Sequence, residues 1–120
     1  MGWDASITKN NKSLRLEDVS PTIKQAFEQA SDNVWKTAGA YDAGLNYYGL
    51  CTNKSASCLS KAMDVSPYDE DGWSADKVKE LYANSKWIVP ESKDDWWAFY
   101  SAKAFVEVCI EHDLGIRFSF

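Results

Sequence analysis

The chain has 120 residues, of which 45% are hydrophobic and 26% charged, and its formal net charge is −5. This composition excludes a disordered chain and predicts one domain, residues 1–120, that folds around a hydrophobic core without obligatory disulfides or metals. No apolar run approaches the roughly 18–20 residues that a membrane span needs, and the acidic balance disfavours direct binding to nucleic acid.

The first element predicted along the chain is a β-hairpin. Residues 3–9 (WDASITK) alternate apolar and polar side chains, the pattern of a strand with one buried face. Asn10 and Asn11 favour a tight turn because asparagine tolerates left-handed backbone geometry. Leu14 and Leu16 resume the alternation on the other side of the turn.

Ser20-Pro21 predicts the start of a helix over residues 21–38, and Gly39 its end. Apolar side chains recur there at helical spacing: Ile23, Ala26, Phe27, Ala30, Val34 and Ala38. Residues 40–54 show no clean period and predict a short helix or turn. A small helix is predicted over 55–64, and Ser74 caps another that runs to about Lys86.

The segment 86–90 is predicted to be extended and to end at Pro90. Ser92 then predicts the start of a long helix over about 93–113, which Gly115 ends. One broad apolar stripe follows this helix: Ala98, Phe99, Ala102, Phe105, Val106, Cys109 and Ile110. After it, Ile116, Phe118 and Phe120 alternate with polar residues as a last strand.

Together these elements predict an α+β fold. The N-terminal hairpin and the C-terminal strand form a three-stranded antiparallel sheet, packed by two main helices and two shorter ones. The aromatic residues expected in the core are Trp3, Phe27, Trp35, Phe99, Phe105, Phe118 and Phe120.

The net negative charge lies in one third of the chain. Residues 64–95 carry nine acidic residues and four lysines, whereas the rest of the chain carries nine acidic and nine basic residues. Such a segment favours a protein partner with a basic face, and tyrosine and tryptophan beside charge are typical of protein interfaces. The predicted binding surface consists of Tyr47, Tyr48, Asp69, Glu70, Asp71, Trp73, Asp76 and Trp87. A solvated acidic loop, with aromatic residues that wrap the core, is the alternative interpretation.

Two other classes stay open. Cysteine and histidine are zinc ligands, so Cys51, Cys58, Cys109 and His112 could form a structural zinc site, although six residues separate the first two. A cysteine-dependent enzyme would use Cys109 with His112 one turn away, but a thiol on an apolar stripe is poorly activated. The acidic loop fails the calcium-loop pattern, because Val78 falls where the bidentate glutamate belongs. We therefore expect neither a cofactor nor enzymatic activity.

The opening MGWDA, the short hairpin after it and the closing SAKAFVEVCIEHDLGIRFSF are similar to small accessory proteins of phages and prophages. Some members of that group inhibit host defence machinery by stoichiometric binding. The resemblance implies no functional residue. With the acidic segment, it leads us to expect a non-enzymatic protein-binding module of the anti-defence or immunity type. No secretion signal is evident, so we expect it to act in the cytoplasm, that of the host if it is phage-encoded.

Overall fold

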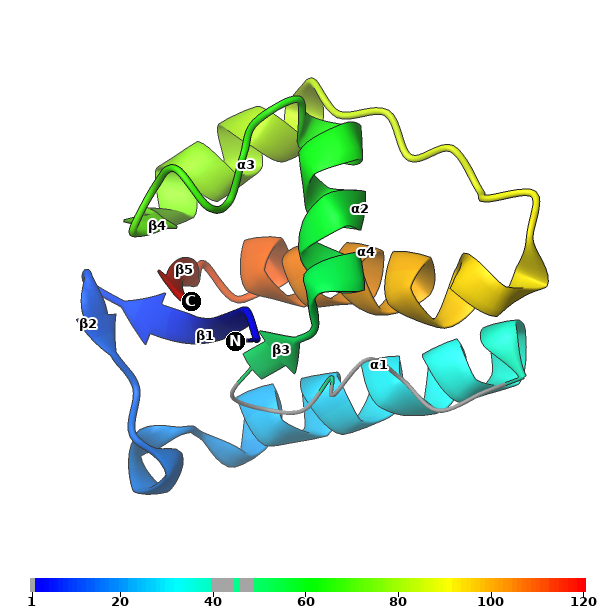
Figure 1. The fold of residues 1–120 in the computed structure, drawn as a ribbon. Helices are drawn as coiled ribbons and strands as arrows, with labels where there is room; N and C mark the ends of the chain where they lie inside the picture. Colours follow the sequence, from blue (N-terminus) through cyan, green and yellow to red (C-terminus); the bar gives the residue numbers. More distant parts are fainter. Residues whose placement is uncertain (1, 40–44, 46–48) are drawn as a thin grey trace.

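The computed structural model describes residues 2–39, 45 and 49–120. Its architecture is α+β: a five-stranded antiparallel sheet packs against α-helices around one hydrophobic core (Figure 1). The predicted fold class is confirmed, although the sheet has two more strands than expected. Among the described residues, no helix combines the length and the apolar character that crossing a membrane requires.

Residues from the two ends of the sequence form the centre of the sheet. Strand β1 (Asp4–Lys9) runs antiparallel to β5 (Gly115–Ser119), and Ala5 lies opposite Phe118 in this register. Both side chains are buried, and the next pair, Ser6 and Arg117, lies on the other face. Because side chains alternate along a strand, this register gives the sheet one apolar and one polar face.

The predicted hairpin turn is confirmed. Asn10 and Asn11 have φ angles of 53° and 63°, the left-handed geometry expected of a tight two-residue turn. The returning strand β2 (Lys12–Ser13) is only two residues long, so the second half of the hairpin is shorter than predicted. A 3₁₀ turn, Leu16–Asp18, then leads into the first helix.

Two short strands lie in stretches that were predicted to be irregular. Strand β3 (Gly49–Cys51) pairs with the first half of β1, and β4 (Gly72–Trp73) pairs with β5. The rest of the short helix or turn predicted over 40–54 falls largely on residues 40–44 and 46–48, which lie outside the described residues.

Helix α1 (Pro21–Ala38) has the bounds that the sequence predicts. The Ser20 side chain accepts a hydrogen bond from the backbone N–H of Ile23 at 3.3 Å, which satisfies a donor that the first helical turn leaves free. Gly39 ends the helix in left-handed geometry, with φ 66°.

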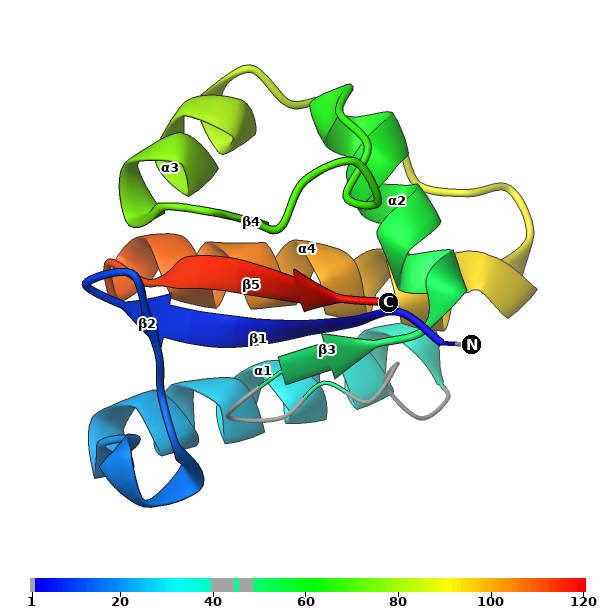
Figure 2. The same ribbon diagram turned by 60° about the vertical axis from the view of Figure 1, so that its left-hand side comes forward.

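Helix α4 (Trp96–Glu111) contacts α1, α2 (Asn53–Met63) and α3 (Ala75–Ala83). Figure 2 shows α1 and α4 behind the sheet. A 3₁₀ turn, Lys93–Asp95, precedes α4 where the sequence predicted the first turn of the helix itself.

The chain reverses after α4 at Asp113, whose φ is 56°, and not at Gly115 as predicted. Gly115 instead begins β5, where its lack of a side chain is needed for close packing. A Cβ at Gly115 would lie 2.8 Å from the carbonyl oxygen of Trp73. The glycine therefore allows β4 to approach β5 closely.

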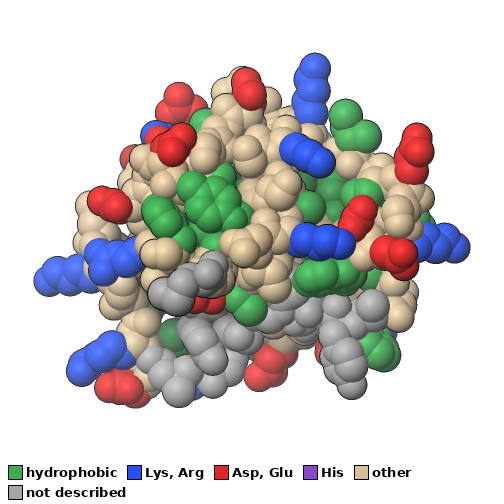
Figure 3. Space-filling view, in the orientation of Figure 1, with side chains coloured by type: hydrophobic (Ala, Val, Ile, Leu, Met, Phe, Trp, Pro, Cys, Tyr) green, Lys and Arg blue, Asp and Glu red, His purple; other side chains and the backbone are tan. Residues whose placement is uncertain are grey.

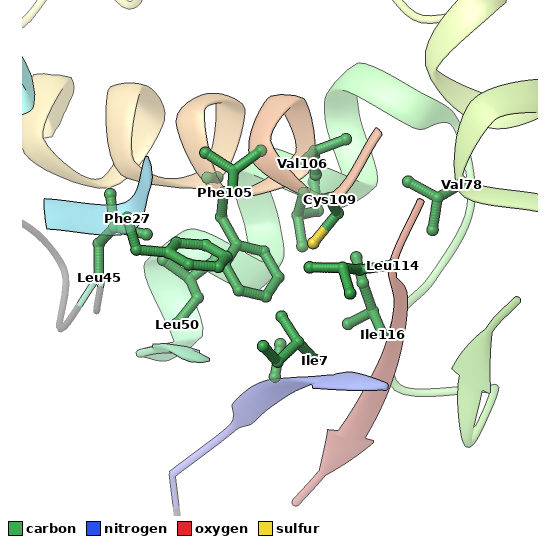
Figure 4. Close-up of a cluster of buried hydrophobic side chains, with 14 of the residues drawn as sticks. Ile7, Phe27, Leu45, Leu50, Val78, Phe105, Val106, Cys109, Leu114 and Ile116 are labelled. Atoms are coloured by element: carbon green, nitrogen blue, oxygen red, sulfur yellow. The ribbon is translucent and has the colours of Figure 1, made fainter. Parts of the chain in front are cut away.

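The core fills the space between the apolar face of the sheet and the helices. Figure 4 shows Phe27 and Phe105 in contact between strand and helix, with Cys109 and Leu114 beside them. Two residues assigned to the core are exposed, so these predictions are wrong. Trp35 is 49% exposed because it lies off the buried face of α1, and Phe120 is 58% exposed because β5 ends before it.

Candidate functional site

The acidic loop between α2 and α3 carries the first part of the predicted binding surface. Asp69 and Asp71 are exposed, and neither carboxylate has an ion-pair partner within 4 Å among the described residues. Asp76 is exposed on the first turn of α3, where the helix dipole favours a negative charge. The structure therefore presents three of the four predicted carboxylates to solvent.

Glu70, the fourth carboxylate, is used inside the chain. It accepts a hydrogen bond from the indole N–H of Trp73 and forms an ion pair with Lys77 at 3.0 Å. Because both carboxylate oxygens have a partner, Glu70 fixes the loop to the start of α3. The loop is thus held in one conformation while its flanking carboxylates stay exposed.

Trp73 is 2% exposed, so the prediction that it presents a surface ring is wrong. Its ring meets Phe118 edge-on at 4.8 Å between centroids, and its backbone pairs with β5. The sequence gives little indication that Trp73 is buried, because this residue belongs to a strand of only two residues. Its role in the structure is to tie β4 to the core.

Trp87, the remaining predicted aromatic residue within the described part of the chain, packs against residues outside the acidic loop. Its half-buried ring lies between Tyr82 and Phe99. The extended segment that follows α3 runs on the side of α2 opposite to β4 (Figure 1). Tyr47 and Tyr48 lie outside the described residues. The described part of the predicted surface is therefore not one contiguous site.

A different pair of aromatic residues lies beside the exposed carboxylates. Tyr68 is 40% exposed, and its ring meets Phe120 edge-on with the ring centroids 5.6 Å apart. The Tyr68 hydroxyl donates a hydrogen bond to the Asn53 side chain at 2.7 Å, which fixes the ring. The amide of Phe118 donates to the carbonyl of Asp71 at 2.8 Å, which holds the loop against the end of β5.

We call the surface formed by Tyr68, Asp69, Asp71 and Phe120 the acidic face. Tyr68 could have been found from the sequence, because it precedes Asp69 directly in a turn-forming Ser-Pro-Tyr-Asp stretch. Phe120 could not, since its alternation with Phe118 predicts burial. Arg117, opposite Gly72 in the β4–β5 pair, is an exposed cation in this region and forms no ion pair with either carboxylate.

The structure does not assemble the zinc site that was the alternative interpretation. No group of three or more potential metal ligands occurs among the described residues, which include Cys51, Cys58, Cys109 and His112. Cys109 is fully buried beside Val106 and Leu114 in Figure 4, and His112 caps the end of α4. Burial raises the pKa of the Cys109 thiol far above its ordinary value, which opposes both metal binding and nucleophilic attack.

Cys109 should therefore resist alkylation in the folded protein. We expect N-ethylmaleimide to leave Cys109 unmodified under native conditions and to modify it fully in urea. Tryptic mapping separates this residue from Cys58, whose half-buried thiol serves as the internal reference. Native labelling of Cys109 as fast as in the unfolded chain would contradict its place in the core.

The geometry thus leaves one predicted feature, the acidic loop, at an exposed surface with aromatic neighbours. The expected likeness to phage and prophage accessory proteins stays a prediction. Comparison of the chain with protein-family models, curated proteins and solved structures finds no match.

Proposed function

We propose that this protein is a non-enzymatic binding module whose acidic face docks on a basic surface of a protein partner. The observation that carries the proposal is the contact between Tyr68 and Phe120, two exposed rings at the loop that carries the unpaired carboxylates of Asp69 and Asp71. Aromatic rings dominate the binding energy of many interfaces, while neighbouring charges favour association with a partner of opposite sign.

The acidic face is already ordered without a partner. The hydrogen bond of Tyr68 to Asn53, the ion pair of Glu70 with Lys77 and the backbone contact of Asp71 with β5 all fix it. A rigid surface loses little conformational entropy on binding, which increases affinity. Such a module acts by occupancy, which is the mode of action of stoichiometric inhibitors of the anti-defence and immunity type.

Reversing two charges on the acidic face should release the partner. We expect Asp69→Lys/Asp71→Lys to lower the retention of a stoichiometric partner on the immobilised protein by on the order of tenfold or more, because like charges would then face each other. The measurement is native mass spectrometry of complexes captured from an extract of the producing cells, at two salt concentrations.

The matched control is Glu28→Lys/Asp32→Lys, which makes the same change of charge on exposed positions of α1. This control should retain the partner as the unchanged protein does, and both variants should unfold at similar urea concentrations. Equal retention by all three proteins, or no stoichiometric partner on any of them, would contradict the proposal.

A further inference from the structure

A pocket of about 560 Å³ lies between α2, the segment 86–91 and the beginning of α4. Its volume is in the range of sites that bind small molecules. Figure 3 shows hydrophobic side chains lying between lysines on this side of the molecule. The pocket is separate from the acidic face, and an inference about it is independent of the proposed function.

The wall formed by the segment 86–91 is fixed at both ends. The backbone N–H of Lys86 donates to the carbonyl of Ala62 at the end of α2, at 2.9 Å. The indole N–H of Trp96 donates to the carbonyl of Pro90 at 2.8 Å. The pocket is therefore held open by hydrogen bonds to two different helices, and a ligand would meet a preformed site.

The pocket has an apolar interior. Ala98 and Phe99 come from the buried side of α4, and Cys58 and Ala62 come from α2. At the rim, Ile88 is 79% exposed, although it is a large apolar side chain. Apolar surface of this kind is stabilised when a ligand covers it.

The charges at the pocket are divided between its two ends. At one end Lys54 forms an ion pair with Asp95 at 2.7 Å, and the hydrogen bond and charge of Asp95 raise the pKa of Lys54. Glu91 belongs to the same end, because the neighbouring Pro90 is bonded to Trp96. At this end the charged residues that line the pocket are thus two carboxylates, Glu91 and Asp95, and one lysine, Lys54.

Lys61 and Lys86 lie at the other end. Lys61 is seven residues beyond Lys54, about 10 Å along the helix axis, and the Lys86 backbone is bonded to the neighbouring Ala62. Among the described residues neither ammonium group has a carboxylate within 4 Å. Two unpaired cations thus border an apolar pocket, in a protein whose overall charge is negative.

We propose that this pocket binds a small amphipathic anion: a carboxylate with an unbranched apolar body. The carboxylate would lie between Lys61 and Lys86, and the apolar body would lie along Ala62 and Phe99 towards Ile88. Lysine suits this ligand, because its ammonium group acts as a point charge towards an anion. A cationic or neutral ligand would leave both ammonium groups without a counter-charge.

Decanoate is the probe for the test, and the thiol of Cys58 inside the pocket reports its presence. We expect decanoate to slow the alkylation of Cys58 by N-ethylmaleimide in a saturable manner and to leave the rate at Cys51 unchanged. Trypsin cleaves after Lys54 and so places the two cysteines in separate peptides. Decan-1-ol, with the same chain and no charge, should protect Cys58 at roughly fivefold to tenfold higher concentration.

The double variant Lys61→Gln/Lys86→Gln should weaken protection by decanoate by roughly the same fivefold to tenfold and leave protection by decan-1-ol unchanged. Lys12→Gln/Lys36→Gln removes two exposed lysines elsewhere and should behave as the unchanged protein. Far-ultraviolet circular dichroism would verify that both variants are folded. The proposal is overturned if decanoate at about 1 mM does not protect Cys58. Protection of the Lys61/Lys86 variant as strong as in the unchanged protein would also overturn it.

Discussion

Replacing Phe105 by alanine should lower the free energy of unfolding by about 3–5 kcal/mol. The ring is completely buried between the sheet and α1, and its centroid lies 5.6 Å from that of Phe27. The substitution loses the free energy gained by burying an aromatic ring, and it leaves a cavity that the surrounding backbone cannot close. Because a domain of this size is stable by only about 5–15 kcal/mol, urea denaturation should show a large shift of the midpoint.

Phe120→Ala is the matched control, since it deletes the same ring from an exposed position. It loses an edge contact with Tyr68 and little buried area, so we expect a cost of about 1 kcal/mol or less. Losses of equal size in the two variants would contradict the core described here. The same control protein is informative for function, because it lacks one of the two rings of the acidic face.

Trp73→Ala should be the second strongly destabilising change, at about 3–5 kcal/mol. The indole is buried against Phe118, and its N–H donates to Glu70. Loss of the ring should therefore detach β4 from β5 and release the acidic loop as well. We expect both a lower urea midpoint and weaker retention of the partner.

Trp73→Phe separates the packing of this ring from its hydrogen bond to Glu70. The smaller ring keeps most of the burial but cannot donate to Glu70, a loss of about 1.5–3 kcal/mol for a hydrogen bond to a charged group. A folded Trp73→Phe protein should retain the partner fully, whereas Phe120→Ala should not. If the Trp73→Phe protein folds but does not retain the partner, the hydrogen bond from Trp73 to Glu70 is needed to hold the acidic loop in its binding conformation.

The helices and the centre of the sheet were accessible from the sequence because local chemistry determines them. Ser20, Pro21 and Gly39 specify both ends of α1, and the two asparagines specify the hairpin turn. The alternation in β1 and β5 places matching apolar faces at both ends of the chain. Each of these signals acts over a few residues and needs no knowledge of the partner element.

Strands β3 and β4 were not accessible, because they are too short to show a periodic pattern and exist only through pairing with β1 and β5. Whether Trp73 is buried depends on that pairing, so the sequence pattern around it does not predict its burial. The exposure of Phe120 has the opposite origin: its alternation is correct, but no described element covers it. At the candidate site, the sequence therefore identified the exposed Asp69, Asp71 and Asp76 but predicted an exposed Trp73, which is buried, and a buried Phe120, which is exposed.

The pairing of β1 with β5 also determines the order of events when a ribosome makes this protein. Asp4 pairs with Ser119, so β1 is synthesised well before its central partner β5 exists. The apolar side of β1 and one of its edges stay uncovered during that time, which makes the nascent chain a target for chaperones and for aggregation. Helix α1 can form meanwhile, since its backbone hydrogen bonds are local, but the sheet closes last. Sequence-distant pairing of this kind slows folding, so we infer a slow final step in which β5 inserts between β1 and β4.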